Sequence, residues 1–293
     1  YSPTMKVTKA VIPAAGLGTR MLPISKSVPK EMLPLVDKPA IQYLVEEAVA
    51  AGITDILIIT GRGKEAMENH FDHNLEYYER LEKGGKTKIL EELKGIANIA
   101  NISFIRQKEA KGLGHAVNCA RSFVGNDPFV VLYGDDVIIS ENPVAKQLVD
   151  VYEKHGMPVV GVNKVTEEQI VKYCSLKVEH MHDNVYHVSD MIEKPAKDKI
   201  FSLFSILGRV LLTPDIFDIL DHTAPGAGGE IQLTDAMREL AVTKGMTACD
   251  FEGKRYDIGS KFGFLQANID LGLKHPETAD ALRAYIKELA GNL

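Results

Sequence analysis

Short apolar runs alternate with stretches of helical periodicity through the first part of the chain. The runs are bounded by polar or turn-forming residues, as in strands buried on both faces of a sheet, and they lie at residues 7–12, 55–59, 101–106 and 128–133. Between the first two runs, apolar residues recur at helical spacing after Pro39, and Gly52 is placed to end that helix. This alternation predicts an α/β fold with a mostly parallel central sheet flanked by helices.

The second part of the chain, after about residue 165, has a looser pattern. Three further strands are expected there, at residues 171–179, 184–192 and 205–212, and the middle one alternates apolar and polar positions. Helical spacing predicts helices at 115–123, 233–244, 261–273 and 276–289, and a solvated, charged helix pair over 75–93. We therefore expect one continuous domain, residues 5–293, with a smaller antiparallel section in its later part.

The turn after the first strand carries the strongest chemical signal. Small residues there leave backbone N–H groups open to a ligand, and such a turn forms a cradle for an anion. Positive side chains follow the turn closely, so the segment predicts a site for a nucleoside triphosphate. The small residues are Ala14, Ala15, Gly16 and Gly18, and the positive ones are Arg20, Lys26 and Lys30.

Two common phosphate-binding motifs are absent from this segment. The dinucleotide motif G-x-G-x-x-G fails because Met21 stands where its third glycine would be. The P-loop motif G-x-x-x-x-G-K-[ST] does not occur in the chain. A Gly-x-Gly pair by itself is equally typical of an ordinary tight turn.

An acidic pair, Asp135 and Asp136, follows the predicted strand at 128–133. Ligands of open parallel sheets gather at the carboxyl ends of the strands, so we expect this pair and the turn at Gly16 to lie at one edge of the sheet. Two adjacent carboxylates repel each other unless a cation is near, which favours a metal site over a simple turn.

Composition excludes several classes of protein. The formal net charge of −6 argues against a dedicated nucleic-acid binder. No apolar run approaches the ~20 residues that span a membrane, and residues 1–4, to which we assign no role, lack signal-peptide character. The three cysteines form no C-x-x-C pair, so a reduced, cytoplasmic protein is expected.

Longer strings around these residues resemble the nucleotide-sugar pyrophosphorylases. Gly16-Leu-Gly-Thr-Arg20 and Pro29-Lys-Glu-Met-Leu-Pro34 carry the resemblance, which recurs in the family's order at 111–115, 134–136, 193–195 and 229–235. It implies a Rossmann-like nucleotidyltransferase fold. In that fold residues 5–165 are the mainly nucleotide-binding part, 166–260 the mainly sugar-phosphate-binding part, and 261–293 a pair of C-terminal helices suited to an oligomer interface.

The resemblance also implies an activity. The expected reaction transfers uridylyl from UTP to glucose 1-phosphate with the help of Mg²⁺, and it gives UDP-glucose and pyrophosphate. A homodimer or homotetramer is implied as well. Two alternatives stay open: the same reaction with dTTP or another hexose 1-phosphate, and a regulator that binds a nucleotide sugar without turnover.

The family's roles are transferred to matching positions. Arg20 and Lys30 are expected to neutralise the triphosphate, and Lys194 to meet the sugar phosphate. Glu193 and Gly134 are expected to contact the sugar, which requires a bend near Pro195 because successive strand residues face opposite ways. The metal ligands would be Asp135 and Asp257. The nucleotide contacts would be Ala14, Ala15, Gly16, Gly18, Thr19, Gln107 and Gly112.

Departures from the family pattern concentrate on the sugar side. Cys174 follows Tyr173 where family members commonly have glycine, and residues 202–205 read Ser-Leu-Phe-Ser where Ser-Asn-Leu-Ala is common. A side chain at position 174 would crowd a hexose that lies against backbone. The pattern therefore predicts the nucleotide more firmly than the sugar. The role of Glu230 and Asp235 stays open between substrate contact and capping of the helix at Leu233.

Overall fold

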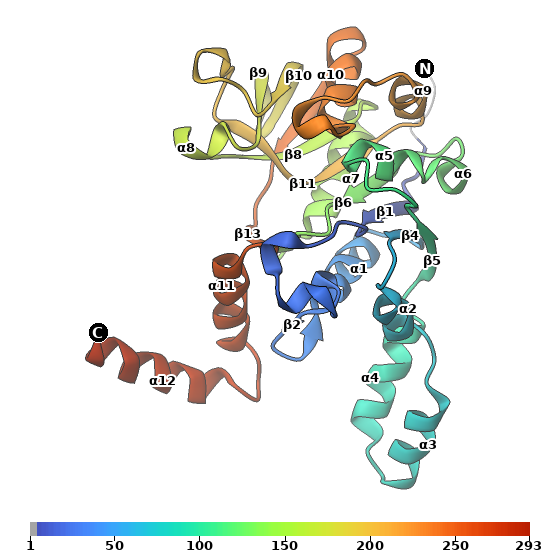
Figure 1. The fold of residues 1–293 in the computed structure, drawn as a ribbon, viewed down its shortest axis with the longest axis vertical. Helices are drawn as coiled ribbons and strands as arrows, with labels where there is room; N and C mark the ends of the chain where they lie inside the picture. Colours follow the sequence, from blue (N-terminus) through green and yellow to red (C-terminus); the bar gives the residue numbers. More distant parts are fainter. Residues whose placement is uncertain (1–4) are drawn as a thin grey trace.

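One large sheet organises the molecule. A computed structural model describes residues 5–293, and residues 1–4 lie outside the described part of the chain (Figure 1). The sheet has nine strands. In spatial order they are β5 (Asn101–Arg106), β4 (Asp55–Thr60), β1 (Lys9–Pro13), β6 (Phe129–Leu132), β11 (Phe204–Leu212), β8 (Val159–Lys164), β12 (Met246–Asp250), β10 (Val185–Glu193) and β9 (Cys174–His182).

Most strands of this sheet run in the same direction. Parallel pairing joins β5, β4, β1 and β6, and also joins β8 to β12. Only β11 and β10 run the other way among the described strands, because each pairs antiparallel with both of its neighbours. The expected α/β class is confirmed. The antiparallel section is not a separate sheet, since the β9–β10 hairpin extends the main sheet at its edge.

Helices cover both faces of the sheet. Side chains of β1 alternate between two apolar layers, with Ala10 and Ile12 on one face and Val11 on the other. The first face is covered by α1 (Ala40–Ala50), α2 (Glu65–Phe71) and α7 (Val144–His155). The second is covered by α5 (Leu113–Asn118), α6 (Arg121–Val124), α9 (Asp215–Asp221) and α10 (Leu233–Thr243). Double coverage explains why the central strands are apolar throughout.

Short elements connect this core to the site. Strands β7 (Asp136–Ile139) and β13 (Lys254–Asp257) form an antiparallel pair in which Asp136 lies opposite Asp257. A hairpin of β2 (Pro34–Leu35) and β3 (Lys38–Pro39) precedes α1. The pairing of β7 with β13 brings the acidic pair next to a residue more than a hundred positions later in the chain.

Several element boundaries differ from the sequence prediction, and two of the differences have a clear local cause. The helix expected at 115–123 is broken, because the N–H groups of Cys119 and Ala120 bond to carbonyls three residues back and tighten the turn between α5 and α6. The strand expected from 171 begins only at Cys174, since Thr166 caps the short helix α8 (Glu167–Ile170) and helical turns continue to Tyr173.

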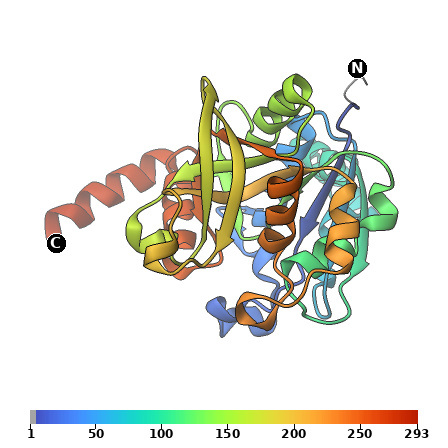
Figure 2. The same ribbon diagram turned by 90° about the horizontal axis from the view of Figure 1, so that it is seen from above.

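Three helices project from the compact body. The charged stretch forms a pair, α3 (Leu75–Lys83) and α4 (Thr87–Ala97), which confirms the predicted solvated helices. After α11 (Lys261–Gly272), the last helix, α12 (Ala279–Asn292), extends away from the sheet in both views (Figures 1 and 2). None of the helices in the described residues combines the length and apolarity needed to cross a membrane.

Candidate active site

A cavity of about 560 Å³ lies at the carboxyl ends of β1 and β6. Ten of its lining residues are among the predicted site residues, so the structure brings the small-residue turn and the acidic pair to one edge of the sheet. These are Ala14, Ala15, Gly16, Gly18, Thr19, Lys30, Gln107, Gly112, Gly134 and Asp135. The cavity wall also contains Tyr133, Leu113 and Glu230. No role in ligand binding was predicted for Tyr133 or Leu113; Tyr133 had been placed in the strand expected at 128–133.

Close backbone packing shapes this cavity. A Cβ atom at Gly134 would lie 2.6 Å from the carbonyl oxygen of Pro13, so only glycine lets the two strand ends approach this closely. The N–H of Ala14 donates to the Ile59 carbonyl at 2.8 Å, and Gly18 has a left-handed φ of 67°. The turn is therefore held in a single shape before any ligand binds.

Two cations and two carboxylates meet at the open side of the cavity. Lys30 Nζ lies 2.5 Å from Asp135 Oδ1, and Arg20 NH1 lies 3.0 Å from Asp257 Oδ2. Arg20 NH2 also reaches Asp135 Oδ2 at 3.4 Å, so one guanidinium joins both acids. Burial lowers the pKa of Arg20, but the hydrogen bonds and negative charges of Asp257 and Asp135 outweigh it and raise that pKa overall.

The same pair of carboxylates fits a divalent cation. Nucleotidyl transfer ordinarily recruits such an ion, which bridges phosphate oxygens. Asp135 and Asp257 offer hard oxygen ligands, and both already converge on one positive group, Arg20. Their side chains are 33% and 21% exposed, which leaves room for the waters that Mg²⁺ usually retains.

Asp136 has a different environment from its neighbour. It is buried, and Arg255 Nε lies 2.5 Å from its Oδ1. Burial raises the pKa of Asp136, and the charges of Arg255 and Arg209 oppose that rise. The sequence argument that both adjacent acids depend on a metal was therefore wrong for Asp136, because Arg255 supplies its counter-charge.

Of the residues predicted to meet the sugar phosphate, Gly134 lines the cavity, whereas Glu193 and Lys194 lie outside its lining, at the end of β10. The predicted bend falls at Lys194 itself, whose φ of 47° is left-handed and whose N–H donates to the Tyr173 carbonyl at 2.6 Å. Glu193 is half-buried and accepts a hydrogen bond from Thr234 Oγ1 at 2.8 Å. Burial raises the pKa of Glu193, and Thr234 and Lys194 partly offset that rise.

The two sequence departures on this side contact each other. Cys174 lies opposite Glu193 in the β9–β10 register, and its Sγ is 3.5 Å from Ser205 Oγ. Ser205 also accepts from the Cys174 N–H at 3.3 Å, and both residues are buried. The thiol thus points into a polar contact within the protein and is absent from the cavity lining.

Gln107 is held by neighbours on one side only. Its Nε2 lies 2.8 Å from His115 Nδ1 and donates to the Gly112 carbonyl at 3.3 Å. Its Oε1 accepts no hydrogen bond from the described residues. The side chain lines the cavity, so this oxygen is placed to accept a hydrogen bond from a ligand.

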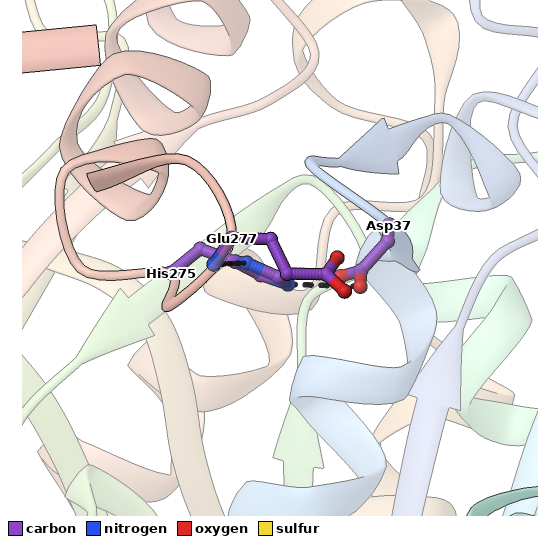
Figure 3. Close-up of side chains that lie close together, drawn as sticks. All are labelled: Asp37, His275 and Glu277. Carbon is purple, nitrogen blue, oxygen red and sulfur yellow. Dashed lines mark hydrogen bonds and ion pairs between the residues drawn. The ribbon is translucent and has the colours of Figure 1, made fainter. Parts of the chain in front are cut away.

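A second cluster of potential metal ligands is already occupied by its own hydrogen bonds. Among the described residues, Asp37, His275 and Glu277 gather potential ligand atoms within 4.8 Å of one another (Figure 3). His275 Nδ1 accepts the Glu277 N–H at 3.1 Å, so the ring proton of the neutral imidazole lies on Nε2, which faces Asp37 Oδ2 at 2.9 Å. With both nitrogens occupied, the cluster acts as a link between the β2–β3 hairpin and the start of α12.

The sequence and the fold were compared with those of known proteins, and the matches agree with the site described above. The family model described as nucleotidyl transferase matches residues 9–272, so the chain belongs to the nucleotidyl transferase family. Among curated relatives, UTP–glucose-1-phosphate uridylyltransferase YngB of Bacillus subtilis is 51% identical over 284 residues, covering 97% of this chain and 96% of the relative. A UTP–glucose-1-phosphate uridylyltransferase of Staphylococcus epidermidis is 49% identical over 97% of this chain.

Solved structures agree with these relatives. A UDP-glucose pyrophosphorylase complexed with UDP-glucose superposes with a TM-score of 0.85 at 42% identity, covering 92% of this chain and all of that one (100%). A UTP-bound UGPase from Acinetobacter baumannii superposes with a TM-score of 0.90 at 37% identity, covering 97% of this chain and 100% of that one.

Proposed function

We propose that this protein transfers uridylyl from UTP to glucose 1-phosphate and releases UDP-glucose and pyrophosphate. The observation that carries the proposal is the convergence of Arg20, Lys30, Asp135 and Asp257 beside a cavity walled by the small-residue turn. The named activities of relatives about 50% identical over nearly the whole chain support it.

The reaction needs no covalent enzyme intermediate. A phosphate oxygen of glucose 1-phosphate forms a bond to the α-phosphorus of UTP, and the bond from that phosphorus to the β-phosphate oxygen breaks. Pyrophosphate leaves with the electron pair. The nucleophile is already an anion near neutral pH, so the enzyme's task is to align two polyanions and to offset their repulsion.

Arg20 and Lys30 are the proposed ligands of the triphosphate. In this structure Arg20 pairs with Asp257, and Lys30 pairs with Asp135. Mg²⁺ is the proposed divalent ion, and when bound by the two carboxylates it would carry part of the phosphate charge. The guanidinium of Arg20 and the ammonium of Lys30 would donate hydrogen bonds to phosphate oxygens. Arg20 offers a planar fork of donors, and Lys30 a compact charge.

The proposed sugar site lies at the end of β10. Successive side chains of a strand point to opposite faces, but the left-handed backbone at Lys194 breaks this alternation. We therefore propose that Glu193 and Lys194 bind the same ligand. Lys194 pairs with the phosphate of glucose 1-phosphate, and Glu193 accepts hydrogen bonds from sugar hydroxyls. Cys174 pairs with Glu193 across β9 and β10, so its buried contact with Ser205 lies beside the proposed sugar ligand. This contact, at two positions that depart from the family pattern, is the reason to test other hexose 1-phosphates as substrates.

The proposed base contacts recognise a feature shared by uracil and thymine. Gln107 Oε1 is placed to accept the ring N–H, and backbone at Ala14, Ala15, Gly16 and Gly112 lines the same cavity. A methyl group changes binding by only about 1–3 kcal/mol in such a pocket, so dTTP is the nucleotide to compare with UTP.

Initial-rate assays of pyrophosphate release test the proposal. UTP, dTTP and CTP would each be paired with glucose 1-phosphate and with other hexose 1-phosphates, with and without Mg²⁺. We expect the highest kcat/KM for UTP with glucose 1-phosphate. Fastest release with another pair would change the substrate assignment, and no release with any pair would favour a nucleotide-sugar-binding regulator.

We further propose that residues 5–165 mainly bind nucleotide and residues 166–260 mainly bind sugar phosphate. The helices in 261–293 are proposed to join copies of the chain into a homodimer or homotetramer. An apolar groove between α11 and α12 supports this, as does α12 itself, which buries none of its residues and exposes Tyr285 and Leu289. A cytoplasmic location is proposed from the three free cysteines and the nucleotide substrate.

A further inference from the structure

Arg255 lies on the strand that carries one of the two proposed metal ligands. It is two residues before Asp257 on β13, so both side chains lie on the same face of that strand. The other face carries Lys254 and Tyr256, and both of these contact Asp270 of α11. Arg255 therefore shares the face of the charged site, whereas its neighbour Lys254 faces the helix α11.

The Arg255 side chain contacts both an acid and an aromatic ring. Its Nε lies 2.5 Å from Oδ1 of Asp136, the neighbour of the proposed metal ligand Asp135. The same guanidinium lies over the ring of Tyr173, with its central carbon 5.5 Å from the ring centroid. An aromatic face attracts a cation, and the attraction is stronger where water is excluded. Only 19% of the Arg255 side chain is exposed, so it forms a largely shielded bridge from Asp136 to Tyr173.

Tyr173 in turn holds the backbone at Lys194. Its carbonyl accepts the Lys194 N–H at 2.6 Å. Lys194 has a left-handed φ of 47°, a conformation that a lysine keeps only where surrounding contacts fix it. Because Glu193 pairs with Cys174, this hydrogen bond extends the β9–β10 pairing by one residue into the bend. The position of Tyr173 therefore sets the position of the bend and of the Lys194 side chain.

Glu193, the other proposed ligand at the end of β10, is supported by a different element. It accepts a hydrogen bond at 2.8 Å from Thr234, which lies on α10. The supports of Glu193 and Lys194 thus come from different parts of the fold, so one can be removed while the other stays. Loss of the contact between Arg255 and Tyr173 is expected to act on the phosphate end of the sugar phosphate and to spare its hydroxyl groups.

We propose that Arg255 is a positioning residue, which acts through Tyr173 to hold Lys194 in place relative to the carboxylates of Asp135 and Asp257. The inference rests on the proposed function, in which Lys194 meets the phosphate of glucose 1-phosphate. In-line transfer requires two phosphates that bind to different elements to be aligned, and a rigid bridge between those elements lowers the cost of alignment. Arg255 itself touches no substrate in this account.

Tyr173→Leu tests the bridge, because it removes the ring and keeps the pair of Arg255 with Asp136. We expect the KM for glucose 1-phosphate to rise about 10-fold, since Lys194 loses its fixed position as a charged hydrogen-bond donor. The KM for UTP is expected to stay within about two-fold of its wild-type value. Arg255→Met should give the same pattern. Thermal unfolding shows whether each variant folds, and Tyr173→Leu decides alone if Arg255→Met does not.

Lys254→Met is the matched control. Lys254 is the adjacent cation on β13, and it has the same kinds of partner on the opposite face: it pairs with Asp270 at 2.6 Å and lies 5.3 Å from the centroid of the Tyr256 ring. Its replacement is expected to leave both KM values unchanged. A rise in the KM for glucose 1-phosphate equal to that in Arg255→Met would mean that loss of charge from the strand is responsible, and it would overturn the assignment.

A double-mutant cycle with Lys194 separates positioning from a general structural role. In the Lys194→Met background the group to be positioned is gone, so adding Tyr173→Leu should raise the KM for glucose 1-phosphate by no more than about two-fold further. A further rise as large as in the wild-type background would sink the proposal, as would unchanged KM values or an equal rise of both in Tyr173→Leu. These results leave the activity of the wild type intact. Absence of pyrophosphate release by the wild type would instead overturn the proposed function, and this inference with it.

Discussion

Glu31 and Lys64 form a buried ion pair beneath the small-residue turn, with Lys64 Nζ 2.7 Å from Glu31 Oε1. The same ammonium donates to the Ala14 carbonyl at 2.6 Å. Glu31 follows Lys30 on one short helical turn, so the pair ties the turn at Ala14 to the segment that presents Lys30. Burial raises the pKa of Glu31 and lowers that of Lys64, and their mutual attraction opposes both shifts.

Lys64→Met is predicted to weaken UTP binding more than binding of glucose 1-phosphate. The variant leaves Glu31 buried without a partner, which costs about 3–5 kcal/mol of stability in comparable cases. It also releases Ala14, so the KM for UTP should rise at least about 10-fold, while the KM for glucose 1-phosphate changes little. Both constants would be measured with thermal unfolding alongside.

Lys38→Met serves as the control for that variant. Lys38 pairs with Glu46 at 3.0 Å, but both side chains are partly exposed and remote from the turn. Its removal should cost about 0–1 kcal/mol and leave the KM for UTP unchanged. If Lys64→Met lowers the melting temperature and raises both KM values in parallel, the pair supports the fold alone and does not position the turn.

Replacing Asp135 is predicted to lower activity, whereas replacing the adjacent Asp136 is predicted to lower stability. Asp135→Asn removes a half-exposed carboxylate from the charge cluster, so kcat should fall about 10²–10³-fold with the melting temperature little changed. Asp136→Asn leaves the half-buried Arg255 without its counter-charge, so the loss should be in stability, at about 1–3 kcal/mol. Activity assays and urea unfolding of both variants check this. Equal effects of the two changes on kcat would contradict the division of roles.

Local features of the site were predictable from the sequence, whereas long-range pairings were not. The turn at Ala14–Gly18 is contiguous, so its residue types alone indicate its shape and chemistry. The contact of Arg20 with Asp257 joins residues 237 positions apart and was not predicted; the family resemblance had placed Asp257 in the site only as a metal ligand. The Lys64–Glu31 and Arg255–Asp136 pairs were missed, because a charged residue looks solvated until its neighbours across the fold are known.

The helices and strands were likewise predictable only where their local sequence pattern is strong. Central strands such as β4 were predicted because burial on both faces leaves a continuous apolar run. Strand β8 and helix α7 were not predicted, although both are well buried. The bend at the end of β10 was inferred from the requirement that Glu193 and Lys194 face one ligand. Its position at Lys194 and not at Pro195 depends on a backbone hydrogen bond to Tyr173, which lies just before β9 and is distant in sequence.

Acid is predicted to weaken sugar-phosphate binding through Glu193. Because burial raises the pKa of Glu193, this carboxylate is fully ionised only at a higher pH than an ordinary glutamate near 4.3, and protonation removes an acceptor for sugar hydroxyls. As pH falls through the raised pKa, kcat/KM for glucose 1-phosphate should decline. The ratio of wild type to Glu193→Gln isolates this effect, since the substrate's own titration is common to both.

The raised pKa of Glu193 also predicts the stability of Glu193→Gln. A carboxyl group whose pKa is raised on folding contributes stability that is present below its unfolded pKa and is lost as pH rises through the folded pKa. Replacing Glu193 with neutral glutamine therefore should not destabilise the fold near pH 7, and glutamine Oε1 still accepts from Thr234. A wild-type to variant ratio that is constant between acid and neutral pH would refute the role of Glu193.

The buried pair of Arg209 and Glu47 is predicted to be costly to break. Arg209 is fully buried, and its Nε and NH2 donate to the two carboxylate oxygens of Glu47 at 2.8 and 2.9 Å. NH2 also donates to the Asp136 carbonyl at 2.8 Å, so the pair supports the backbone next to Asp135 from below. Glu47→Gln should therefore lower the free energy of unfolding by about 3–5 kcal/mol in urea titrations.

Two comparisons make that prediction specific. Arg121 pairs with Asp221 at 2.7 Å on the surface, and Arg121→Met should cost no more than about 1 kcal/mol. The double variant Glu47→Met/Arg209→Met removes both buried charges, so it should recover part of the stability that Glu47→Gln loses. A loss of unfolding free energy in Glu47→Gln no larger than that in Arg121→Met would contradict the prediction. It would mean that the carbonyls of Gly208 and Asp136 alone compensate the burial of Arg209, and that Glu47 is not needed to support the backbone at the acidic pair.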